Sequence, residues 1–362
     1  MKPFLQIFSM LTLFIISFYY PPPKARGIHT EKYAKASRLT NGRHFVRIAF
    51  YNTENMYDPG KDSTKSDDEF TPAGARKWTY TKFYSKLNHL GKTILAMGDG
   101  EPPAAVGLCE IENRRVLNCL TASTPLRPFR YQVVHYDSPD LRGVDVALLY
   151  RPERLRILYS IPIAVRFPQD SSLRTRDILY AKGILENGDT LHLFVNHWPS
   201  RRGGAKKSSG RRAVAASILR RYVDSLFRKV HHPGIIIMGD FNDEPADRSL
   251  ENVLQANPVT ESIFPDRLYN LMFRKLRTTG SGTIKYQGKW SVFDQIIVSG
   301  TLLLKESGYV THEADASIFR GKFLLQEDEK HMGDKLYRTY QGPSYKGGFS
   351  DHLPVYLDLT KK

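Results

Sequence analysis

Cysteine is scarce in this sequence, with only Cys109 and Cys119 among 362 residues. Two cysteines exclude a disulfide-rich scaffold, and their separation by ten residues lacks the paired spacing of a zinc–thiolate site. Cys109 ends an apolar run, which favours a place in the core. Whether the two thiols bond to each other stays open, because a sequence alone does not define their geometry.

The middle of the chain has no Gly/Ser-rich linker, no break in composition and no internal repeat. One large domain over residues 40–362 is therefore favoured over two. Apolar residues at helical spacing in segments 80–97 and 211–230 predict two helices that cover a sheet. Segments 58–78 and 311–347 are rich in polar and turn-forming residues, which predicts insertions or long loops.

Acidic residues are fewer than basic ones: the sequence has 37 Asp and Glu and 53 Lys and Arg, which gives a net charge of +16. This excess favours polyanionic partners, and it predicts contact with DNA or RNA. Basic residues concentrate in segments 201–212 and 274–277. Tyr286 and Trp290 each follow a lysine, and they either stack on bases or pack in a core. Solvated loops or contact with an anionic membrane are the alternatives. The sequence indicates no protein partner.

The N-terminus has an apolar stretch at residues 4–20 after Lys2. It resembles an export signal, so residues 1–27 are predicted to be a signal peptide or an N-terminal membrane anchor, with a buried helix as the alternative. The predicted location is therefore outside the cytoplasm: periplasmic, secreted, or associated with a membrane through this segment. No cysteine lies nearby, which argues against lipid attachment.

The most informative segment is GIIIMGDFNDEP at residues 234–245. Its aliphatic run into Gly239 predicts a buried strand, and ligands collect where the strands of such sheets end. Asp240 and Asn242 are two residues apart, so on an extended chain they point the same way. A plain strand-to-turn junction closed by Pro245 is the structural alternative.

The same pattern recurs along the chain, and turns alone explain the recurrence poorly. Apolar strands lead to residues suited to phosphate or metal chemistry at Asn52 and Glu54, Glu110, His197, Asp294, and Asp351 with His352. Taken singly, each has a structural explanation, such as a turn cap, a surface ion pair or an interior histidine.

In chain order, the motifs NTEN, a strand-end Glu, NHWPS, GDFN, FDQ and SDH resemble the endonuclease/exonuclease/phosphatase superfamily. Its members include pancreatic-type deoxyribonuclease and exonuclease III-like apurinic endonucleases. The resemblance covers about residues 44–360, and GDFN with a C-terminal SDH is its most specific pair. It implies an α/β fold, a four-layer α/β sandwich with two packed mixed β-sheets flanked by helices. It also implies that residues 40–362 form a metal-dependent phosphoesterase domain.

The resemblance implies a site for Mg²⁺, or Mn²⁺, in which Glu110 is the principal carboxylate. Asn52 and Asp351 are the further metal ligands, and Glu54 is a supporting group. Hard divalent ions prefer oxygen ligands and neutralise charge on phosphate oxygens.

The resemblance also implies the catalytic roles. His352 matches the histidine placed against the scissile phosphate, and Asp294 matches the carboxylate that orients it. Asp240 would hold or deprotonate the attacking water, and Asn242 would donate an amide hydrogen bond toward the phosphate. His197 would stabilise or protonate the leaving oxygen, as in deoxyribonuclease-like members, where apurinic endonucleases commonly have tyrosine.

Two arginines, Arg142 and Arg201, are candidate phosphate-binding residues, with a charged turn around Gly143 as the alternative for the first. Which carboxylate orients His197 stays open among Asp137, Asp140 and Asp145.

These features favour an exported, divalent-metal-dependent nuclease that hydrolyses phosphodiester bonds in DNA or RNA as an endonuclease. A sphingomyelinase-like or inositol-phosphatase-like enzyme of the same fold is the alternative, although GDFNDEP lacks the Trp-Xaa-Gly-Asp-Xaa-Asn-Xaa-Arg pattern of inositol phosphatases. A non-catalytic polyanion-binding protein is a third hypothesis, against which the complete catalytic set weighs.

Overall fold

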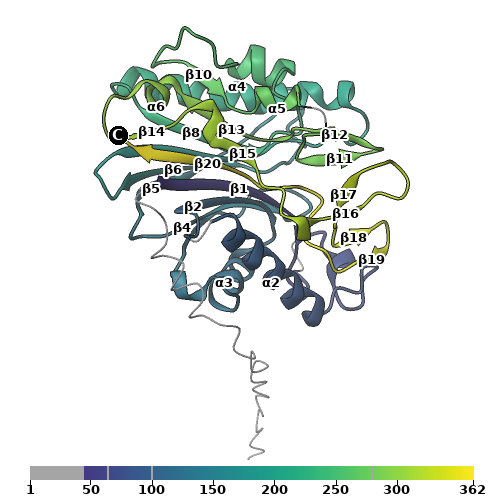
Figure 1. Cartoon of the computed structure of the whole chain (residues 1–362). Coiled ribbons are helices and arrows are strands. Elements are labelled where there is room, and N and C mark those ends of the chain that lie inside the picture. The colour runs from purple at the N-terminus through teal and green to yellow at the C-terminus, as the bar shows by residue number, and fades with distance from the viewer. Residues whose placement is uncertain (1–44, 63–64, 99–100, 279) are drawn as a thin grey trace, which may run out of the picture. The chain divides into compact units, whose positions relative to one another are not determined.

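Two seven-stranded sheets form the centre of this computed structural model, which describes residues 45–62, 65–98, 101–278 and 280–362 (Figure 1). Sheet 1 has the order β14-β20-β1-β2-β4-β3, and β15 also pairs with β20. Its strands are β1 (Phe45–Met56), β2 (Ala105–Ile111), β3 (Gln132–His135), β4 (Asp145–Tyr150), β14 (Tyr309–Val310), β15 (Ala316–Ile318) and β20 (Val355–Lys361).

Sheet 2 has the order β5-β6-β7-β8-β13-β10-β9. Its strands are β5 (Leu155–Ile163), β6 (Ile178–Leu185), β7 (Thr190–His197), β8 (Gly234–Asp240), β9 (Ala256–Asn257), β10 (Leu268–Asn270) and β13 (Asp294–Ser299). Both sheets are mixed, because β1–β2 and β7–β8 are parallel pairs while β1–β20 and β8–β13 are antiparallel.

Helices cover the outer faces of both sheets (Figure 1). α2 (Tyr80–Ala96) and α3 (Arg114–Ala122) pack on sheet 1, and α4 (Ala205–Lys229) packs on sheet 2. The shorter helices are α5 (Phe273–Leu276) and α6 (Gly300–Leu304). This order of helix, sheet, sheet and helix confirms the predicted four-layer α/β sandwich.

Alternating side chains of the central strands build separate cores on the two faces of each sheet. On β1, Ile48 and Phe50 face the core between the sheets, while Ala49 and Tyr51 face the core under α2 and α3. This is the period-two alternation of a strand that is covered on both faces. The sheets approach closely at Gly107, where an added Cβ would lie 3.0 Å from the Met238 sulfur.

The predicted helices are both present, with one different boundary. α2 closely matches the segment 80–97, whereas α4 begins at Ala205, six residues before the predicted start. Gly203 and Gly204 have positive φ and end the preceding loop, and the polar turns that follow carry no apolar stripe to reveal the helix.

The segment 311–347, predicted as an insertion or long loop, contains several short strands. β15 joins sheet 1, and two small hairpins follow: β16 (Leu325–Glu327) with β17 (Asp334–Leu336), and β18 (Tyr340–Gln341) with β19 (Ser344–Tyr345). A further hairpin, β11 (Ile284–Tyr286) with β12 (Lys289–Ser291), precedes β13. Strands of two or three residues are too short to show a periodic pattern, which explains why the sequence did not predict them.

The two cysteines are both free. Cys109 lies in the core between the sheets, while Cys119 packs from α3 against the opposite face of sheet 1. The sheet itself separates the thiols, which answers the question of a disulfide between them.

The predicted export signal or anchor at residues 1–27 lies outside the described residues. Among the helices that are described, none combines the length and apolarity needed to cross a bilayer. Residues 45–362, with the gaps given above, belong to one compact unit.

The fold contains a buried histidine that makes stability depend on pH. His192 on β7 is 2% exposed, and its Nδ1 lies 2.8 Å from the Tyr180 hydroxyl. Burial, with a smaller contribution from Lys182, lowers the pKa of His192 to about 4. The unfolded chain protonates this imidazole near pH 6.5, so its contribution to stability is complete above that pH and is lost as the pH falls toward 4.

We expect this histidine to remove about 2 kcal/mol of unfolding free energy between pH 7.5 and pH 4.5. Urea unfolding of the wild type and of His192→Gln at both pH values measures the contribution of His192 to the unfolding free energy, because the variant lacks the titrating group. The variant should lose less stability on acidification; equal losses in the two proteins would contradict the assignment.

Candidate active site

The strand ends that carry the predicted site residues have a left-handed backbone. Glu54, Asn55, Glu110 and Asn242 have φ values of 52°, 56°, 61° and 51°. Such values are uncommon for residues other than glycine, and residues held in them concentrate at functional sites. The β1–β2 and β2–β4 ladders shift register around Glu54, Asn55 and Glu110, as in a β-bulge. Bulges change the direction in which side chains leave a strand. The polar residues therefore lie at the ends of these strands and not among the apolar side chains of the core.

A buried hydrogen bond joins the two sheets inside the site. Asn52 at the end of β1 donates from Nδ2 to Oδ2 of Asp240 at the end of β8, at 3.0 Å. The Asn52 amide oxygen accepts the backbone N–H of Glu54, which fixes the side chain. Within sheet 2, Gly239 allows β7 and β8 to approach, because an added Cβ would lie 2.5 Å from the Asn196 carbonyl oxygen.

Five of the predicted residues form a ring in which carboxylates and imidazoles alternate. The ring is open: from one end to the other it runs Glu110, His197, Asp240, His352 and Asp351. The facing nitrogen and oxygen atoms of neighbouring residues lie 3.9, 3.7, 3.9 and 4.0 Å apart. These separations exceed a direct hydrogen bond, so the facing atoms are available to a bound phosphate or ion. Tertiary structure thus gathers residues from β2, β7, β8 and the loop before β20.

His352 is paired with Asp294, the carboxylate that the resemblance assigns to it. Its Nδ1 lies 2.7 Å from Oδ2 of Asp294, and both side chains are buried. Burial lowers the pKa of His352, but the charges of Asp294 and Asp240 outweigh it and hold the pKa well above its usual value. The geometry therefore favours an imidazolium whose Nε2 faces Asp240.

His197 has a different environment. Burial, followed by the nearby charges of Arg176 and Arg142, holds its pKa well below the usual value. Its Nδ1 has no hydrogen-bond partner among the described residues. The three aspartates considered for orienting it are engaged elsewhere: Asp140 with Arg176, Asp145 with His135, and Asp137 with Lys65. His197 is thus a neutral imidazole that none of these carboxylates orients.

Asp240 is the central acid of the ring. Burial raises its pKa and the neighbouring His352 lowers it, with a net rise to about 7. Its Oδ1 accepts the backbone N–H of Asn242 at 3.0 Å. The Asn242 side-chain amide donates to the Trp198 carbonyl at 3.1 Å, so in this structure it braces the loop after β7.

The two candidate phosphate-binding arginines differ. Arg142 lies beside the ring, with Nη2 3.5 Å from Glu110 Oε1 and a hydrogen bond to the Asn55 side chain. Arg201 donates to the Asn242 carbonyl and pairs with Asp243 and Asp247 at 3.1 and 2.6 Å. Arg201 therefore braces the loop after β8, and its contact with phosphate stays a prediction.

Two basic residues at the site were not predicted from the sequence. Arg338 bridges the carboxylates of Asp351 and Glu54, at 2.8 and 3.4 Å. Lys86 on α2 is 1% exposed and donates to the Glu54 carbonyl and the Thr339 hydroxyl. A lysine three residues after Phe83, on the apolar stripe of a helix, was a readable sign of a buried partner. Arg338 lies in the segment 311–347 and belongs to no motif.

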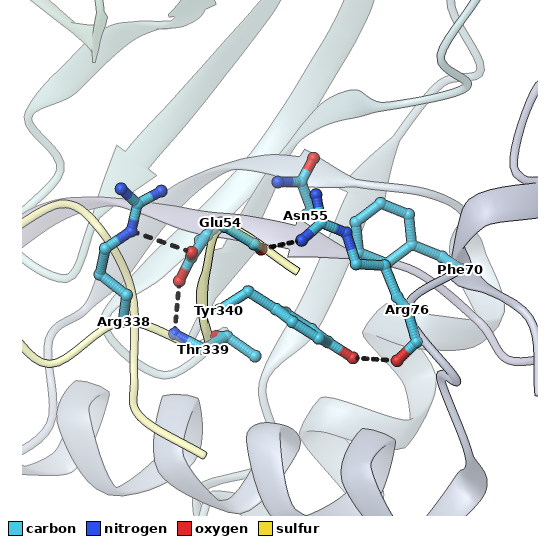
Figure 2. A pocket seen from close by; sticks show the side chains of 8 residues that line it. Glu54, Asn55, Phe70, Arg76, Arg338, Thr339 and Tyr340 are labelled. Carbon is cyan, nitrogen blue, oxygen red and sulfur yellow. Dashed lines mark hydrogen bonds and ion pairs between the residues drawn. The ribbon is translucent and has the colours of Figure 1, made fainter. Parts of the chain in front are cut away.

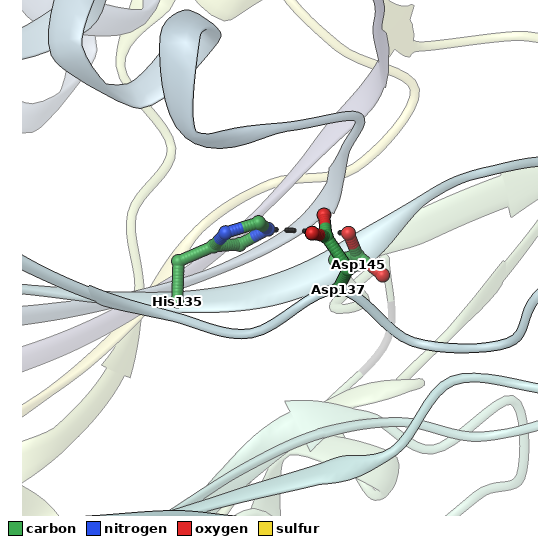
Figure 3. A group of neighbouring side chains, drawn as sticks. All are labelled: His135, Asp137 and Asp145. Atoms are coloured by element: carbon green, nitrogen blue, oxygen red, sulfur yellow. Dashed lines mark hydrogen bonds and ion pairs between the residues drawn. The ribbon is translucent and has the colours of Figure 1, made fainter. Parts of the chain in front are cut away.

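His135, Asp137 and Asp145 form a second acid–histidine group, distinct from the ring residues (Figure 3). Asp145 accepts from Nε2 of His135 at 3.1 Å and from the backbone N–H of Ser138 at 2.8 Å, and Asp137 lies nearby. Asp145 is already bonded on both oxygens, so this group acts as a brace for the connection between β3 and β4.

The residues predicted to hold a metal suit a hard divalent ion. Glu110 and Asp351 are carboxylates whose side chains are 13% and 22% exposed, so both are accessible from solvent. Burial raises the pKa of Asp351, but Arg338 and His352 outweigh it and hold the pKa below its usual value, which keeps the carboxylate ionised. Oxygen donors of this kind are those that Mg²⁺ and Mn²⁺ prefer. The donor set thus fits the group that the resemblance implied.

Carboxylates, imidazoles and arginines gather where strands of the two sheets end, an arrangement compatible with hydrolysis of phosphoesters. The comparisons agree, because a model of the endonuclease/exonuclease/phosphatase family matches residues 47–361. The chain belongs to this family, whose members are metal-dependent phosphoesterases. Comparison with curated proteins gives no match.

Solved structures share the fold at low sequence identity. Humanized D. rerio TDP2 has a TM-score of 0.53 at 16% identity, covering 87% of this chain and 98% of that chain. D. rerio TDP2 complexed with single-strand DNA product gives 0.51 at 16%, covering 87% and 99%. The human Nocturnin catalytic domain with bound sulfate gives 0.50 at 17%, covering 88% and 98%. At these identities the likeness shows the fold alone.

We expect Lys86→Met to destabilise the protein by about 2–4 kcal/mol, because it leaves buried acceptors and part of the Glu54 charge without a partner. Lys92→Met on the exposed face of the same helix is the matched control and should change stability by less than about 0.5 kcal/mol. Chemical denaturation measures both. Equal effects of the two substitutions would show that Lys86 does not support the site.

Proposed function

We propose that this protein is an exported, divalent-metal-dependent nuclease that hydrolyses phosphodiester bonds in DNA or RNA as an endonuclease. The observation that carries the proposal is the ring of Glu110, His197, Asp240, His352 and Asp351, with Asp294 behind His352. Acid, base and anion-binding groups converge there from the strand ends of both sheets, as phosphodiester hydrolysis requires.

Glu110 and Asp351 would hold Mg²⁺ or Mn²⁺, with Asn52 beside them. When bound, such an ion neutralises charge on the nonbridging phosphate oxygens. Family membership supports the need for a divalent ion.

Asp240 would take the proton of the attacking water. Its pKa of about 7 suits a general base, since efficient proton transfer near neutrality needs a group that titrates there. Asn52 holds the carboxylate in place through the hydrogen bond to Oδ2.

The two histidines would act on different oxygens. His352, charged and oriented by Asp294, would donate from Nε2 to a nonbridging oxygen of the scissile phosphate. His197, as a neutral imidazole, would stabilise the leaving oxygen by a hydrogen bond from Nε2. Arg142 would add a permanent positive charge next to Glu110, because the pull of Glu110 outweighs burial and raises its pKa.

The distribution of basic residues on the surface supports a nucleic-acid substrate. Exposed basic residues at the start of α4, after the His197 loop, are Arg202, Lys206, Lys207 and Arg211. A basic surface next to the catalytic edge favours a phosphate backbone. The solved TDP2 structure with single-strand DNA product shows that a related fold binds such a strand. Export rests on the apolar segment after Lys2 alone.

A substrate panel tests the reaction class. Circular plasmid DNA, structured RNA, sphingomyelin and a soluble inositol polyphosphate are each incubated with Mg²⁺, Mn²⁺ or EDTA. Metal-dependent nicking of the plasmid or cutting of the RNA is the expected result. Turnover of lipid or inositol phosphate with intact nucleic acid would replace the nuclease by the alternative phosphoesterase, and no turnover at all would favour a polyanion-binding protein.

We expect His352→Ala to lower kcat by about a hundredfold or more, because it removes the charged donor to the phosphate. His312→Ala is the control: the side chain of His312 is 61% exposed, and this variant should keep wild-type activity. Steady-state hydrolysis by folded samples compares the two. Wild-type turnover by His352→Ala would exclude the mechanism.

We expect Glu110→Gln to weaken binding of Mn²⁺ by about tenfold or more, since it removes a charged ligand. Titration calorimetry measures the affinity without any substrate. Glu251→Gln, at an exposed position of the segment Ser249–Leu254, is the control and should bind like the wild type. Unchanged affinity in Glu110→Gln would place the metal elsewhere.

A further inference from the structure

Several of the basic side chains near the ring are already paired with carboxylates. A cavity of about 190 Å³ opens next to Glu54 (Figure 2), and both arginines that line it are engaged. Arg76 pairs with Glu69 at 2.6 Å. Arg338 pairs with Asp351 at 2.8 Å and with Glu54 at 3.4 Å. A further anion would have to displace these carboxylates, so neither arginine is available to it.

Unpaired basic side chains gather instead at the start of α4. Arg202, Lys206 and Lys207 are exposed, and their charged groups form no ion pair or hydrogen bond with the residues that the structure describes. Arg174, in the loop 164–177 between β5 and β6, is also exposed, and among the described residues it donates only to backbone carbonyls of its own loop. We call these four residues the basic surface.

The loop 164–177 packs on α4, which brings Arg174 close to the start of the helix. Its neighbour Leu173 packs against the core cluster that α4 shares with sheet 2. Hydrogen bonds from Ser172, with a smaller contribution from the charge of Arg211 on α4, lower the pKa of Asp170 in the same loop. Arg211 thus offsets this exposed acid, whereas the basic surface has no such counter-charge among the described residues.

The first turn of α4 has positive charge where a helix accommodates it least. A helix N-terminus has a partial positive charge, which repels cations and attracts anions. Lys206 and Lys207 lie in that turn, no acidic residue is present there, and the N-cap Gly204 supplies no side-chain hydrogen bond. At the other end, Arg228 and Lys229 lie where the helix dipole favours cations. The charges at the start of α4 are therefore unfavourable in the free protein and become favourable when an anion binds.

The basic surface is connected to the His197 side of the ring. Residues 198–204 form the loop between His197 and α4. Arg176, two residues after Arg174, donates from Nη2 to the Trp198 carbonyl at 2.8 Å. Arg212 of α4 donates to the Pro199 carbonyl at 3.3 Å. Both segments that carry the basic surface are thus bonded to the two residues that follow His197.

We propose that the basic surface binds phosphates of a nucleic-acid strand on the leaving-group side of the scissile bond. The inference rests on the proposed nuclease function, in which His197 stabilises the leaving oxygen, and it gives the strand a defined direction through the site. Arg202 is five residues from His197, so their Cα atoms lie at most about 18 Å apart. One strand of a duplex has a phosphate about every 3.4 Å along the helix axis, so this distance spans several phosphates. The part of the strand that departs from His197 therefore reaches the basic surface.

Two double variants of α4 test the surface with equal changes in charge. Lys206→Gln with Lys207→Gln removes two cations of the basic surface, and Arg228→Gln with Lys229→Gln removes two exposed cations from the other end of the helix. The full chain is assayed on a short oligothymidylate and on bis(p-nitrophenyl) phosphate, which has no neighbouring phosphate. The first variant should lower the ratio of kcat/KM for the oligonucleotide to kcat/KM for the small diester by about tenfold, and flatten the log–log salt slope by about 1.4. The control should keep the wild-type ratio and slope.

Neutral methylphosphonate linkages test the direction of the strand. They are placed on one side or the other of a central linkage, and cleavage there is followed by the size of the products. The product that ends in the new hydroxyl identifies the leaving-group side. Neutral linkages on that side should cost the wild type about tenfold in kcat/KM and cost the Lys206/Lys207 variant much less, because its contacts are already absent. On the opposite side the cost should be the same in both proteins.

Several outcomes would overturn the proposal without touching the proposed function. Equal ratios in all three proteins would exclude the basic surface from binding the strand, and a difference in methylphosphonate cost on the opposite side alone would exclude its direction. Sedimentation with vesicles of phosphatidylcholine and phosphatidylserine tests a membrane as the occupant. Loss of vesicle binding in the Lys206/Lys207 variant, with a wild-type ratio, would assign the surface to a membrane.

The melting temperature checks the electrostatic argument on the protein alone. It should stay the same or rise slightly in the Lys206/Lys207 variant, because glutamine relieves the repulsion at the start of α4. A clear fall would contradict that argument. No hydrolysis of the oligonucleotide by the wild type would instead refute the nuclease function itself.

Discussion

The hydrogen bond from Asn52 to Asp240 is the contact on which the arrangement of the site depends, because it joins the two sheets where their strands end. Asn52 belongs to sheet 1, which also carries Glu110, and Asp240 belongs to sheet 2 next to His197. The side chains between the sheets set their separation, and the close contact at Gly107 leaves little freedom there. A relative shift of the sheets would therefore separate the carboxylates that we propose to bind the metal from the groups that we propose for acid–base catalysis. The core between the sheets thus also determines the spacing of the proposed catalytic groups.

Burial gives chemically similar groups different protonation states around the ring. The two imidazoles, both nearly fully buried, have opposite shifts in pKa, because His352 is paired with Asp294 while Nδ1 of His197 has no partner among the described residues. Asp240 and Asp351 differ in the same way, since Arg338 holds the second ionised. Local partners therefore allow one site to combine a charged donor, a neutral donor and a base. These assignments support the division of roles that we propose for phosphodiester hydrolysis.

The segments predicted from the sequence to be insertions or long loops contribute residues to the site. The segments 58–78 and 311–347 meet through Arg76 and Tyr340, and they supply Arg338, which holds two carboxylates of the site. Lys86 links helix α2 to the site, because its ammonium group donates to the Glu54 carbonyl and to the Thr339 hydroxyl. The family fold thus provides the ring, while these segments provide the neighbouring cavity. Differences in substrate among proteins of one fold are expected to lie in such segments, because the strands that position the reacting groups leave little room for change.

The central strands and the two long helices could be predicted from apolar patterns in the sequence, and the family resemblance named the residues of the ring. Long apolar runs are local signals of buried strands, and the motifs GDFN and SDH carry the family resemblance that implied the site residues. The folded arrangement was needed to show that Nδ1 of His197 has no hydrogen-bond partner among the described residues and that Arg201 pairs with Asp243 and Asp247. It also showed that Arg338 and Lys86 contact residues of the site. Each of these facts joins residues far apart in the chain, and no periodicity or spacing encodes such contacts. Pairing between distant charged groups depends on how the sheets and loops pack, which is the information that a linear pattern lacks.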